Sequence, residues 1–440
     1  MKRNAMQSLV DWKNKKHRKP MIIRGARQVG KTWLMKEFGR CEFEKTAYIN
    51  FDKNERMKLL FEGGFDIPRI LRGLSIESGV AIELHNTLII LDEVQEVPAA
   101  LGSLKYFAED NDSDYYILAA GSLLGIALHS GTSFPVGKVE SFDMYPLTFT
   151  EFLGAVGENI LLELLHECDF QMITAFKSKF VDLLKLYYYV GGMPEAVYVY
   201  AENGGLKEVR AIQCQLISDY EQDFSKHAPP AVVPRIQMVW DGIPSQLAKE
   251  NKKFIYSVLR EGSRAKDFEL AIQWLLDCGL CHKVGRVTKS GIPLKAYRDL
   301  PSFKLYLVDV GLLGAMADID EKTLLRGNAI FTEFKGSMTE QYVCQQLAAE
   351  VGAIPYYWSA ENSTGEIDFL VQHSGHILPI EVKAEENLQA KSLKSFISAN
   401  GLPTGIRTSM SDYRVEEKLI NLPLYTFSEL YSVYDSVVTD

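Results

Sequence analysis

Short apolar runs separated by polar stretches give the first part of the chain the pattern of a parallel sheet. The run at residues 88–91, inside TLIILDEV, is apolar throughout and ends on two acids, as is typical of a central strand. Residues 21–24 (MIIR) and 114–122 (DYYILAAGS) are further predicted strands. A helix is expected to begin near residue 33, after the predicted strand at residues 21–24. The pattern therefore predicts an α/β fold with a doubly wound parallel sheet.

The pattern changes in the last quarter of the chain. Residues 365–384, GEIDFLVQHSGHILPIEVKA, alternate apolar and polar positions on either side of a tight turn, which predicts a β-hairpin. An amphipathic helix is expected over residues 331–351 and a strand over residues 355–360. These elements predict a second α/β region.

The region between these two parts combines helical and strand patterns. Apolar residues at helical spacing occur in 247–259 and 265–287, after a proline-rich break at 228–234. Residues 288–309 follow as strand, turn and strand, and two helices before a basic hairpin indicate a winged helix. The basic side chains expected on its wing are Lys283, Arg286, Lys289, Lys295 and Arg298. They indicate contact with DNA phosphates, and the alternative is a packing module between the flanking regions.

A glycine-rich motif follows the first predicted strand. Its sequence, GARQVGKT, has the spacing G-x-x-x-x-G-K-[ST] between a strand and a helix. Backbone N–H groups of such a loop bind phosphate oxygens, and glycine permits the tight turn. We expect Lys31 to contact the β- and γ-phosphates of ATP and Thr32 to bind Mg²⁺. The residues predicted to bind the nucleotide are Gly25, Ala26, Arg27, Gln28, Val29, Gly30, Lys31 and Thr32.

Two later strand ends supply further candidates for the same site. Asp92 is predicted to hold Mg²⁺ directly or through water, and Glu93 to orient or deprotonate an attacking water. Ser122 ends the next strand and would contact the γ-phosphate or that water, because ligands of doubly wound sheets lie beyond the carboxyl ends of the strands. The alternatives are acids that happen to end a strand and a serine that forms a turn.

Four charged residues in the last region have the order of a metal-dependent nuclease site. Glu340 lies on the predicted helix, Asp368 on the first hairpin strand, and Glu381 and Lys383 on the second. Carboxylates are hard ligands for Mg²⁺, and residues two apart share one face of a strand. We therefore consider Glu340, Asp368 and Glu381 as metal ligands, and Asp368, Glu381 and Lys383 as catalytic residues. A surface ion pair and a satisfied buried acid are the alternatives.

Five motifs in this order resemble a family of prokaryotic AAA-type P-loop ATPases with a C-terminal uncharacterised region of the DUF4143 type. They are RGARQVGKTWL, TLIILDEVQEVP, LAAGSLLG, YPLTFTEFL and YVGGMPEAV. The acids and lysine of the last region also resemble the PD-(D/E)XK nuclease superfamily. In the ATPase family an arginine usually follows the glycine before YPL. This chain has Lys138 there, which lacks the planar fork of arginine and puts a finger role in doubt.

The resemblance implies a division of the 440 residues into four parts. A P-loop ATPase domain is expected at 1–190 and a helical lid or connector at 191–234. A winged-helix-like module is expected at 235–325 and a restriction-endonuclease-like α/β domain at 326–440.

Composition limits how such a protein contacts its partners. The formal net charge of -9 means that nucleic-acid binding must use local basic patches. Six cysteines in this length are typical of a reducing compartment, and neither a signal peptide nor a membrane-spanning run is recognisable, so a cytoplasmic protein without a membrane partner is expected.

Two functional hypotheses remain open. In the first, ATP binding and hydrolysis are coupled to DNA binding or processing through the winged helix and the nuclease-like tail. In the second, the chain is an ATP-gated protein-interaction switch whose nuclease-like domain is inactive. Assembly into a homo-oligomer is compatible with both hypotheses.

Overall fold

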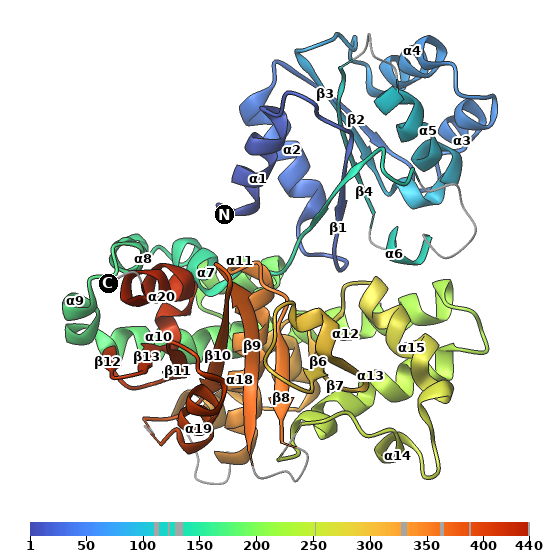
Figure 1. The fold of residues 1–440 in the computed structure, drawn as a ribbon. Coiled ribbons are helices and arrows are strands. Elements are labelled where there is room, and N and C mark those ends of the chain that lie inside the picture. The colour runs from blue at the N-terminus through green and yellow to red at the C-terminus, as the bar shows by residue number, and fades with distance from the viewer. Residues whose placement is uncertain are drawn as a thin grey trace. The chain divides into compact units, whose positions relative to one another are not determined.

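The chain forms two compact units in the computed structural model. The structure describes residues 1–109, 114–121, 124–127, 135–250, 252–326, 332–360, 365–386 and 389–438. The first unit comprises residues 2–145 and 274–280, and the second comprises Met1, residues 146–273 and residues 281–440 (Figure 1).

The first unit contains a parallel sheet with the strand order β2-β3-β4-β1-β5 in the described residues. The strands are β1 (Met21–Arg24), β2 (Lys45–Asn50), β3 (Thr87–Asp92), β4 (Tyr116–Ala120) and β5 (Glu140–Asp143). β1 lies between β4 and β5, and β4 separates it from β3. The predicted α/β fold with a parallel sheet is confirmed.

Helices cover both faces of this sheet, as Figure 1 shows. They are α1 (Ala5–Lys13), α2 (Lys31–Glu42), α3 (Glu55–Glu62), α4 (Ile67–Ser78), η1 (Val94–Glu96), α5 (Pro98–Glu109) and α6 (Leu124–Ala127). Every residue of β3 is buried. Ile89 and Leu91 join the core cluster that contains residues of α3, α4 and α5. Successive side chains point to opposite faces, so Leu88 and Ile90 lie on the face that α2 covers.

The second unit is built on a larger mixed sheet, with the order β12-β13-β11-β10-β9-β8-β6-β7 among the described residues. Its strands are β6 (Cys281–Val287), β7 (Arg298–Leu307), β8 (Tyr356–Ser359), β9 (Glu366–His373), β10 (His376–Val382), β11 (Gly405–Ser409), β12 (Arg414–Glu416) and β13 (Leu419–Pro423). β9 and β10 pair antiparallel across the turn at residues 374–375, as the alternating pattern predicts.

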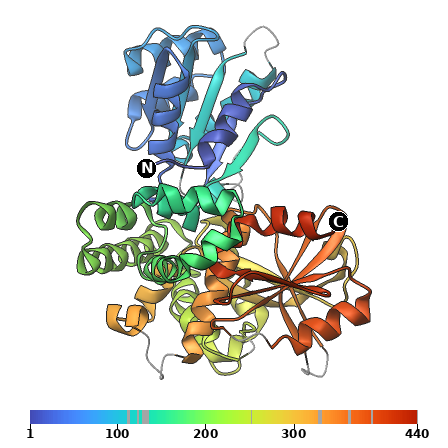
Figure 2. The ribbon, with the colours of Figure 1, turned by 90° about the vertical axis from the view of Figure 1, so that its left-hand side faces the viewer.

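Helices of the second unit come before, between and after these strands. They are α7 (Phe149–Ala155), α8 (Asn159–His166), α9 (Phe170–Ala175), α10 (Lys177–Val190), α11 (Pro194–Asn203), α12 (Leu206–His227), α13 (Val233–Leu247), α14 (Tyr256–Leu259), α15 (Ala265–Asp277), η2 (Leu294–Tyr297), α16 (Val310–Met316), α17 (Glu321–Arg326), α18 (Thr332–Ala349), α19 (Lys391–Asn400), η4 (Leu424–Glu429) and α20 (Leu430–Val438). α19 packs on β9, β10 and β11, and α18 packs on β7 and β10. Figure 2 shows α19 and α20 flanking the sheet.

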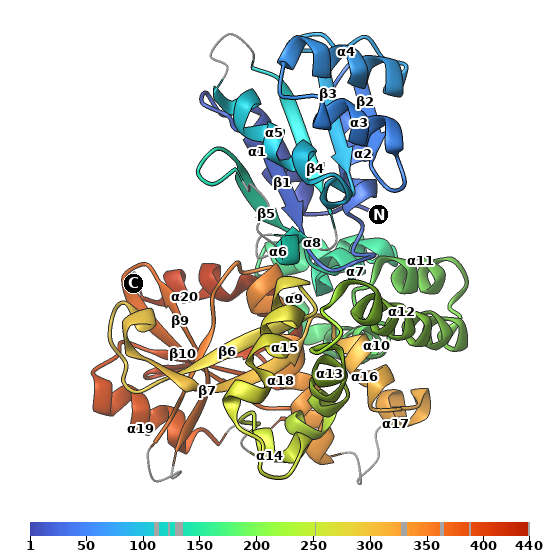
Figure 3. The same ribbon diagram turned by 90° about the vertical axis from the view of Figure 1, so that its right-hand side faces the viewer.

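An antiparallel hairpin forms near the predicted wing, but its first strand is β6, which lies in the stretch expected to be helical up to residue 287. Helix α15 ends at Asp277, and residues 288–297 connect β6 to β7. The sheet does not end with this hairpin. β6 and β7 pair antiparallel, and β6 also pairs in parallel with β8 in the C-terminal region. α13 packs against α14 and β7, with α15 beside it (Figure 3). Backbone hydrogen bonds thus cross the boundary expected at residues 325 and 326, so the sheet does not separate the expected winged-helix module from the tail.

Two of the quoted motifs have structural roles in the second unit. In YPLTFTEFL, Thr148 and Glu151 form a reciprocal capping box at the start of α7. In YVGGMPEAV, the two glycines connect α10 to α11, and the Gly192 N–H donates to Asp309 Oδ2 at 2.6 Å. A Cβ at Gly192 would lie 2.0 Å from the carbonyl oxygen of Leu147. This connection therefore requires glycine for a close backbone approach.

Replacing Gly192 by alanine should destabilise the second unit. The added Cβ must push the Leu147 carbonyl away and disturb the hydrogen bond to buried Asp309, which we expect to cost about 3 kcal/mol. Thermal and urea unfolding would measure this. Gly154→Ala on α7 is the matched control, because its Cβ would meet only Leu162 Cδ2 at 3.8 Å. Equal stability of the two variants would contradict the role of the close approach.

Candidate functional site

The glycine-rich loop lies between β1 and α2 and turns tightly through several backbone positions with positive φ. Gly25, Gln28 and Gly30 have φ values of 139°, 66° and 95°. A Cβ at residue 25 would lie 2.1 Å from the carbonyl oxygen of Met144, so this position requires glycine. Lys31 Nζ donates to the carbonyl oxygens of Gly25 and Ala26 at 2.9 and 2.8 Å. The lysine thus closes the loop with bonds that a phosphate would replace.

Asp92, at the carboxyl end of β3, is a buried acid that joins three elements. Its Oδ2 accepts hydrogen bonds from Thr32 Oγ1 at 2.7 Å and from the Tyr48 hydroxyl at 3.0 Å. Its Oδ1 accepts from the Glu93 N–H at 3.2 Å. Tyr48 comes from β2, and sequence reasoning missed it because nothing in KTAYIN marks its hydroxyl as part of a site. The structure therefore brings Thr32 and Asp92 together.

The residues at this position fit a magnesium ion. The hydroxyl of Thr32 and the carboxylate of Asp92 are hard oxygen donors whose interacting atoms lie 2.7 Å apart. A cation bound between the loop and β3 would replace their mutual hydrogen bond. When bound, Mg²⁺ would neutralise charge on the phosphate oxygens of the nucleotide.

Glu93 is held at the strand end by its neighbours along the chain. Its backbone is left-handed, with φ of 53°, and its Oε2 accepts from Gln95 Nε2 at 2.6 Å. Sequence reasoning did not single out Gln95, although it lies two residues beyond the acid. Ser122 lies outside the described residues. Lys138, at the position where the family usually has arginine, forms an ion pair with Glu109 at 3.1 Å.

A second cluster in the other unit contains the predicted nuclease-like residues together with lysines that the motif does not include. Glu340 on α18 is buried and pairs with Lys252 at 2.7 Å and with Lys304 at 3.7 Å. The Tyr306 hydroxyl donates to Glu340 Oε2 at 3.0 Å. Lys304 lies on β7 with a side chain only 1% exposed, and it also pairs with Glu366 at 2.5 Å.

The other predicted residues of this cluster have their own partners. Asp368 Oδ2 accepts from the Val382 N–H at 2.7 Å. Glu381 and Lys383 form an ion pair at 2.6 Å on β10 and its extension. Glu381 Oε2 is buried and makes no hydrogen bond within the described residues. These side chains line a pocket of about 780 Å³, together with Arg286 and other residues.

This cluster does not fit a metal centre in its present arrangement. No group of three or more His, Cys, Asp or Glu side chains in the described ranges is placed to hold a metal ion. Two lysine ammonium groups already compensate the charge of Glu340, where the motif expects a cation. The shared metal predicted for Glu340, Asp368 and Glu381 therefore disagrees with the geometry. Lys252 and Lys304 were missed because they lie far from the motif in sequence.

Three of the five basic residues expected on the wing are engaged within the chain. Arg286 pairs with Asp299 at 3.1 Å and donates to Ser359 on β8. Lys283 and Lys289 lie 4.4 Å from the ring centroids of Phe303 and Tyr297. The β6–β7 pair is therefore less available to DNA than its sequence indicates.

Comparison with family models assigns the parts of the chain. Residues 17–153 match the model of the AAA domain. The N-terminal part of this chain is a AAA domain. Residues 335–427 match a domain of unknown function (DUF4143), so the expected combination of a AAA domain and a DUF4143 region is confirmed. Residues 181–323 match another domain of unknown function (DUF8612), which the sequence motifs did not indicate.

Solved structures resemble the chain only distantly. A Walker-type ATPase of Pyrococcus abyssi is 14% identical with a TM-score of 0.44, over 72% of this chain and 95% of its own. The Orc1 protein of Aeropyrum pernix, solved in complex with DNA, is 12% identical with a TM-score of 0.26, over 71% and 90%. Cdc6p of Pyrobaculum aerophilum is 11% identical with a TM-score of 0.25, over 72% and 93%. At these scores the likenesses carry no argument about function.

No curated protein matches the sequence. In the parts of the chain that are described, helices long and apolar enough to cross a membrane are absent.

Burial gives Lys31 of the AAA domain an unusual acid–base property. Removal from water lowers its pKa to about 8, although the nearby Glu93 and Asp92 oppose the shift. Its charge is therefore present at neutral pH and is lost as the pH rises through 8. A bound phosphate would favour the charged form.

Nucleotide affinity of the AAA domain should therefore fall at alkaline pH. Because binding of phosphate favours protonated Lys31, we expect a constant affinity for a fluorescent ATP analogue below pH 8 and about a tenfold loss per pH unit above it. Fluorescence anisotropy from pH 6.5 to 9.5 would measure this. Lys31→Arg, which stays charged, is the control for the slope. An unchanged wild-type affinity up to pH 9.5 would contradict the expectation.

The pKa of Asp368 in the DUF4143 region is raised, so this acid, like Lys31, is shifted toward its neutral form. Burial, with the nearby charge of Glu340, raises the pKa of Asp368 to about 7. The folded protein thus keeps a proton on this acid up to about pH 7, whereas the unfolded chain loses it near pH 4. Stability due to this group therefore decreases as the pH rises from 4 to 7.

Replacing Asp368 by asparagine should remove this loss. Asparagine stays neutral at every pH. We therefore expect the free energy of unfolding of the variant, relative to that of wild type, to increase by about 2 kcal/mol from pH 5 to pH 8. Urea unfolding at both pH values would measure the difference. The control is Glu385→Gln, which replaces an exposed acid beyond β10. Its free energy of unfolding relative to wild type should not increase with pH. An asparagine variant that loses stability at pH 8 would favour an ionised, functional Asp368.

Proposed function

We propose that this chain is a Mg²⁺-dependent ATPase whose nucleotide state controls contact of the second unit with DNA, and that the DUF4143 region takes part without cutting. The observation that carries the first part is the set of mutual bonds among Lys31, the loop carbonyls, Thr32 and Asp92. Each of these groups is one that a phosphate or Mg²⁺ would engage, and they converge at the carboxyl ends of β1 and β3.

The chain's own residues supply the steps around the nucleotide. Lys31 exchanges the carbonyl oxygens of Gly25 and Ala26 for oxygens of the β- and γ-phosphates. Thr32 and Asp92 would hold the cation, and Tyr48 keeps the Asp92 carboxylate in position through its hydrogen bond. Glu93, oriented by Gln95, accepts a proton from the attacking water or aligns it.

Glu93→Gln should separate binding of ATP from hydrolysis. We expect normal ATP affinity and a fall of about 10²-fold or more in turnover, because the amide cannot accept the proton of the water. Phosphate release and nucleotide binding would be measured on the same preparation. Glu96→Gln is the matched control, since Glu96 is exposed and lies on η1, the short helix that follows Glu93. Wild-type turnover in Glu93→Gln would overturn the role of Glu93.

Of the two hypotheses for the tail, contact without cleavage has the stronger support. Lys252 and Lys304 compensate the charge of Glu340, so this acid is less able to serve as the metal ligand that metal-assisted hydrolysis requires. Wild type with Mg²⁺ or Mn²⁺ on branched and linear DNA, with and without ATP, should leave the DNA intact. Cleavage by wild type, with loss of cleavage in Asp368→Ala, would overturn this part of the proposal.

The second candidate function is an ATP-gated switch that binds a protein. It is favoured by the internal engagement of Lys283, Arg286 and Lys289, which reduces the basic surface of the wing. DNA affinity that does not change with ATP or with Lys31→Ala would favour this candidate. The cytoplasmic location and assembly into an oligomer stay predictions.

A further inference from the structure

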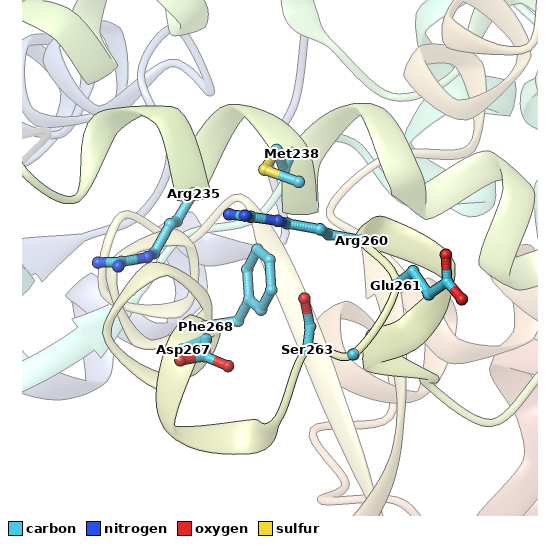
Figure 4. A pocket seen from close by; sticks show the side chains of 8 residues that line it. Arg235, Met238, Arg260, Glu261, Ser263, Asp267 and Phe268 are labelled. Carbon is cyan, nitrogen blue, oxygen red and sulfur yellow. The ribbon is translucent and has the colours of Figure 1, made fainter.

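A pocket of about 310 Å³ in the second unit lies apart from the predicted wing and the acid cluster. It lies between the first turns of α13, the turn after α14 and the first turn of α15 (Figure 4). Its lining includes the two arginines Arg235 and Arg260. The term arginine notch is used below for this pocket.

The two guanidinium groups of the arginine notch have no neutralising carboxylate among the residues that the structure describes. Among the described residues, neither Arg235 nor Arg260 lies within ion-pair distance of a carboxylate, and the side chain of Arg235 donates only a long bond of 3.5 Å to the Ala231 carbonyl. Two like charges that line one pocket repel each other. A bound anion would remove this repulsion.

The acids near the arginine notch do not replace such an anion. Asp267 uses its carboxylate to accept the backbone N–H of Arg264 at 2.8 Å, at the start of α15. The side chain of Glu261 points away from the arginine side chains in Figure 4. Both acids line the same pocket, so an anion here depends on the two guanidinium groups themselves and not on the net charge of the lining.

The walls of the arginine notch give this charge a defined orientation. In Figure 4 the side chain of Arg260 runs between Met238 on α13 and Phe268 on α15. Phe268 is buried, so this wall belongs to the core between the helices. Apolar groups above and below a guanidinium leave its N–H edge free for an acceptor. The planar edge of arginine matches two oxygens of a phosphate.

We infer that the arginine notch binds a phosphodiester group of a nucleic-acid strand. This inference rests on the proposed contact with DNA and moves the contact from the β6–β7 pair to the α13–α15 side of the second unit. In helix-turn-helix proteins the last helix approaches DNA with its N-terminal end. The notch lies beside the N-terminal end of α15, where a backbone phosphate would pass.

The test is the salt dependence of DNA binding by the full-length protein. Fluorescence anisotropy with a labelled 30-base-pair duplex, between 50 and 200 mM salt, would compare wild type with the double variant Arg235→Gln/Arg260→Gln. Removing one neutralised phosphate should lower affinity at least tenfold at low salt and reduce the slope of log affinity against log salt by about 1. Arg264→Gln is the matched control outside the notch, and circular dichroism checks the fold.

Other variants and ligands identify the source of the phosphate. Arg235→Lys/Arg260→Lys keeps the charges and should retain the slope while losing part of the affinity. Inorganic phosphate alone should compete with the duplex only in proteins with both arginines.

Two outcomes would overturn the inference, and they are distinguishable. If the double glutamine variant keeps the DNA affinity of wild type and the same slope of log affinity against log salt, the notch does not bind DNA. The proposed contact of the second unit with DNA would then still hold. No DNA binding by wild type, with inorganic phosphate still bound, would remove the nucleic-acid ligand and the DNA part of the proposed function. ATP turnover measured on the same samples shows whether the AAA domain is intact.

Discussion

The burial of Asp92 is the constraint on which the nucleotide site depends. A carboxylate at the end of a fully buried strand must be hydrogen-bonded, and here it takes bonds from Thr32, Tyr48 and the Glu93 N–H. These bonds connect β2 and β3 to the segment that follows the glycine-rich loop, before any ligand binds. The loop and the strand end are therefore held at bonding distance by the same groups that a cation would use, which limits the rearrangement on binding.

In the second unit, buried acids are stabilised by lysine side chains instead of by neutral hydrogen-bond donors alone. Lys304, almost fully buried, lies between Glu340 and Glu366, and Lys252 adds a second ammonium to Glu340. Burial alone would lower the pKa of Lys304, but the charges of Glu340 and Glu366 raise it overall. The cluster is a network in which each charge depends on its neighbours. Nuclease-like motif residues thus occur here in a setting that compensates their charge with side chains.

Local pattern predicted the elements well where one run of residues carried the signal. The strand at 88–91, the phosphate loop and the hairpin at 365–384 follow from periodicity and glycine positions. Tyr48, Lys252 and Lys304 could not be found in this way, because each reaches its acid from a distant segment. The pairing of β6 with β8 was also missed, because two strands that are far apart in the sequence carry no local signal that they pair.

The pairing of β6 with β8 has a consequence for mechanics. Any rotation of the α13–α15 helices and the β6–β7 pair against the C-terminal strands would have to break a row of backbone hydrogen bonds. A hinge at residue 325 is therefore unfavourable, and a movement that reaches one part of this sheet is transmitted to the rest as to a single rigid body. For the same reason, a chain ended at residue 325 would expose the open edge of β6, a surface that invites pairing with other chains and aggregation.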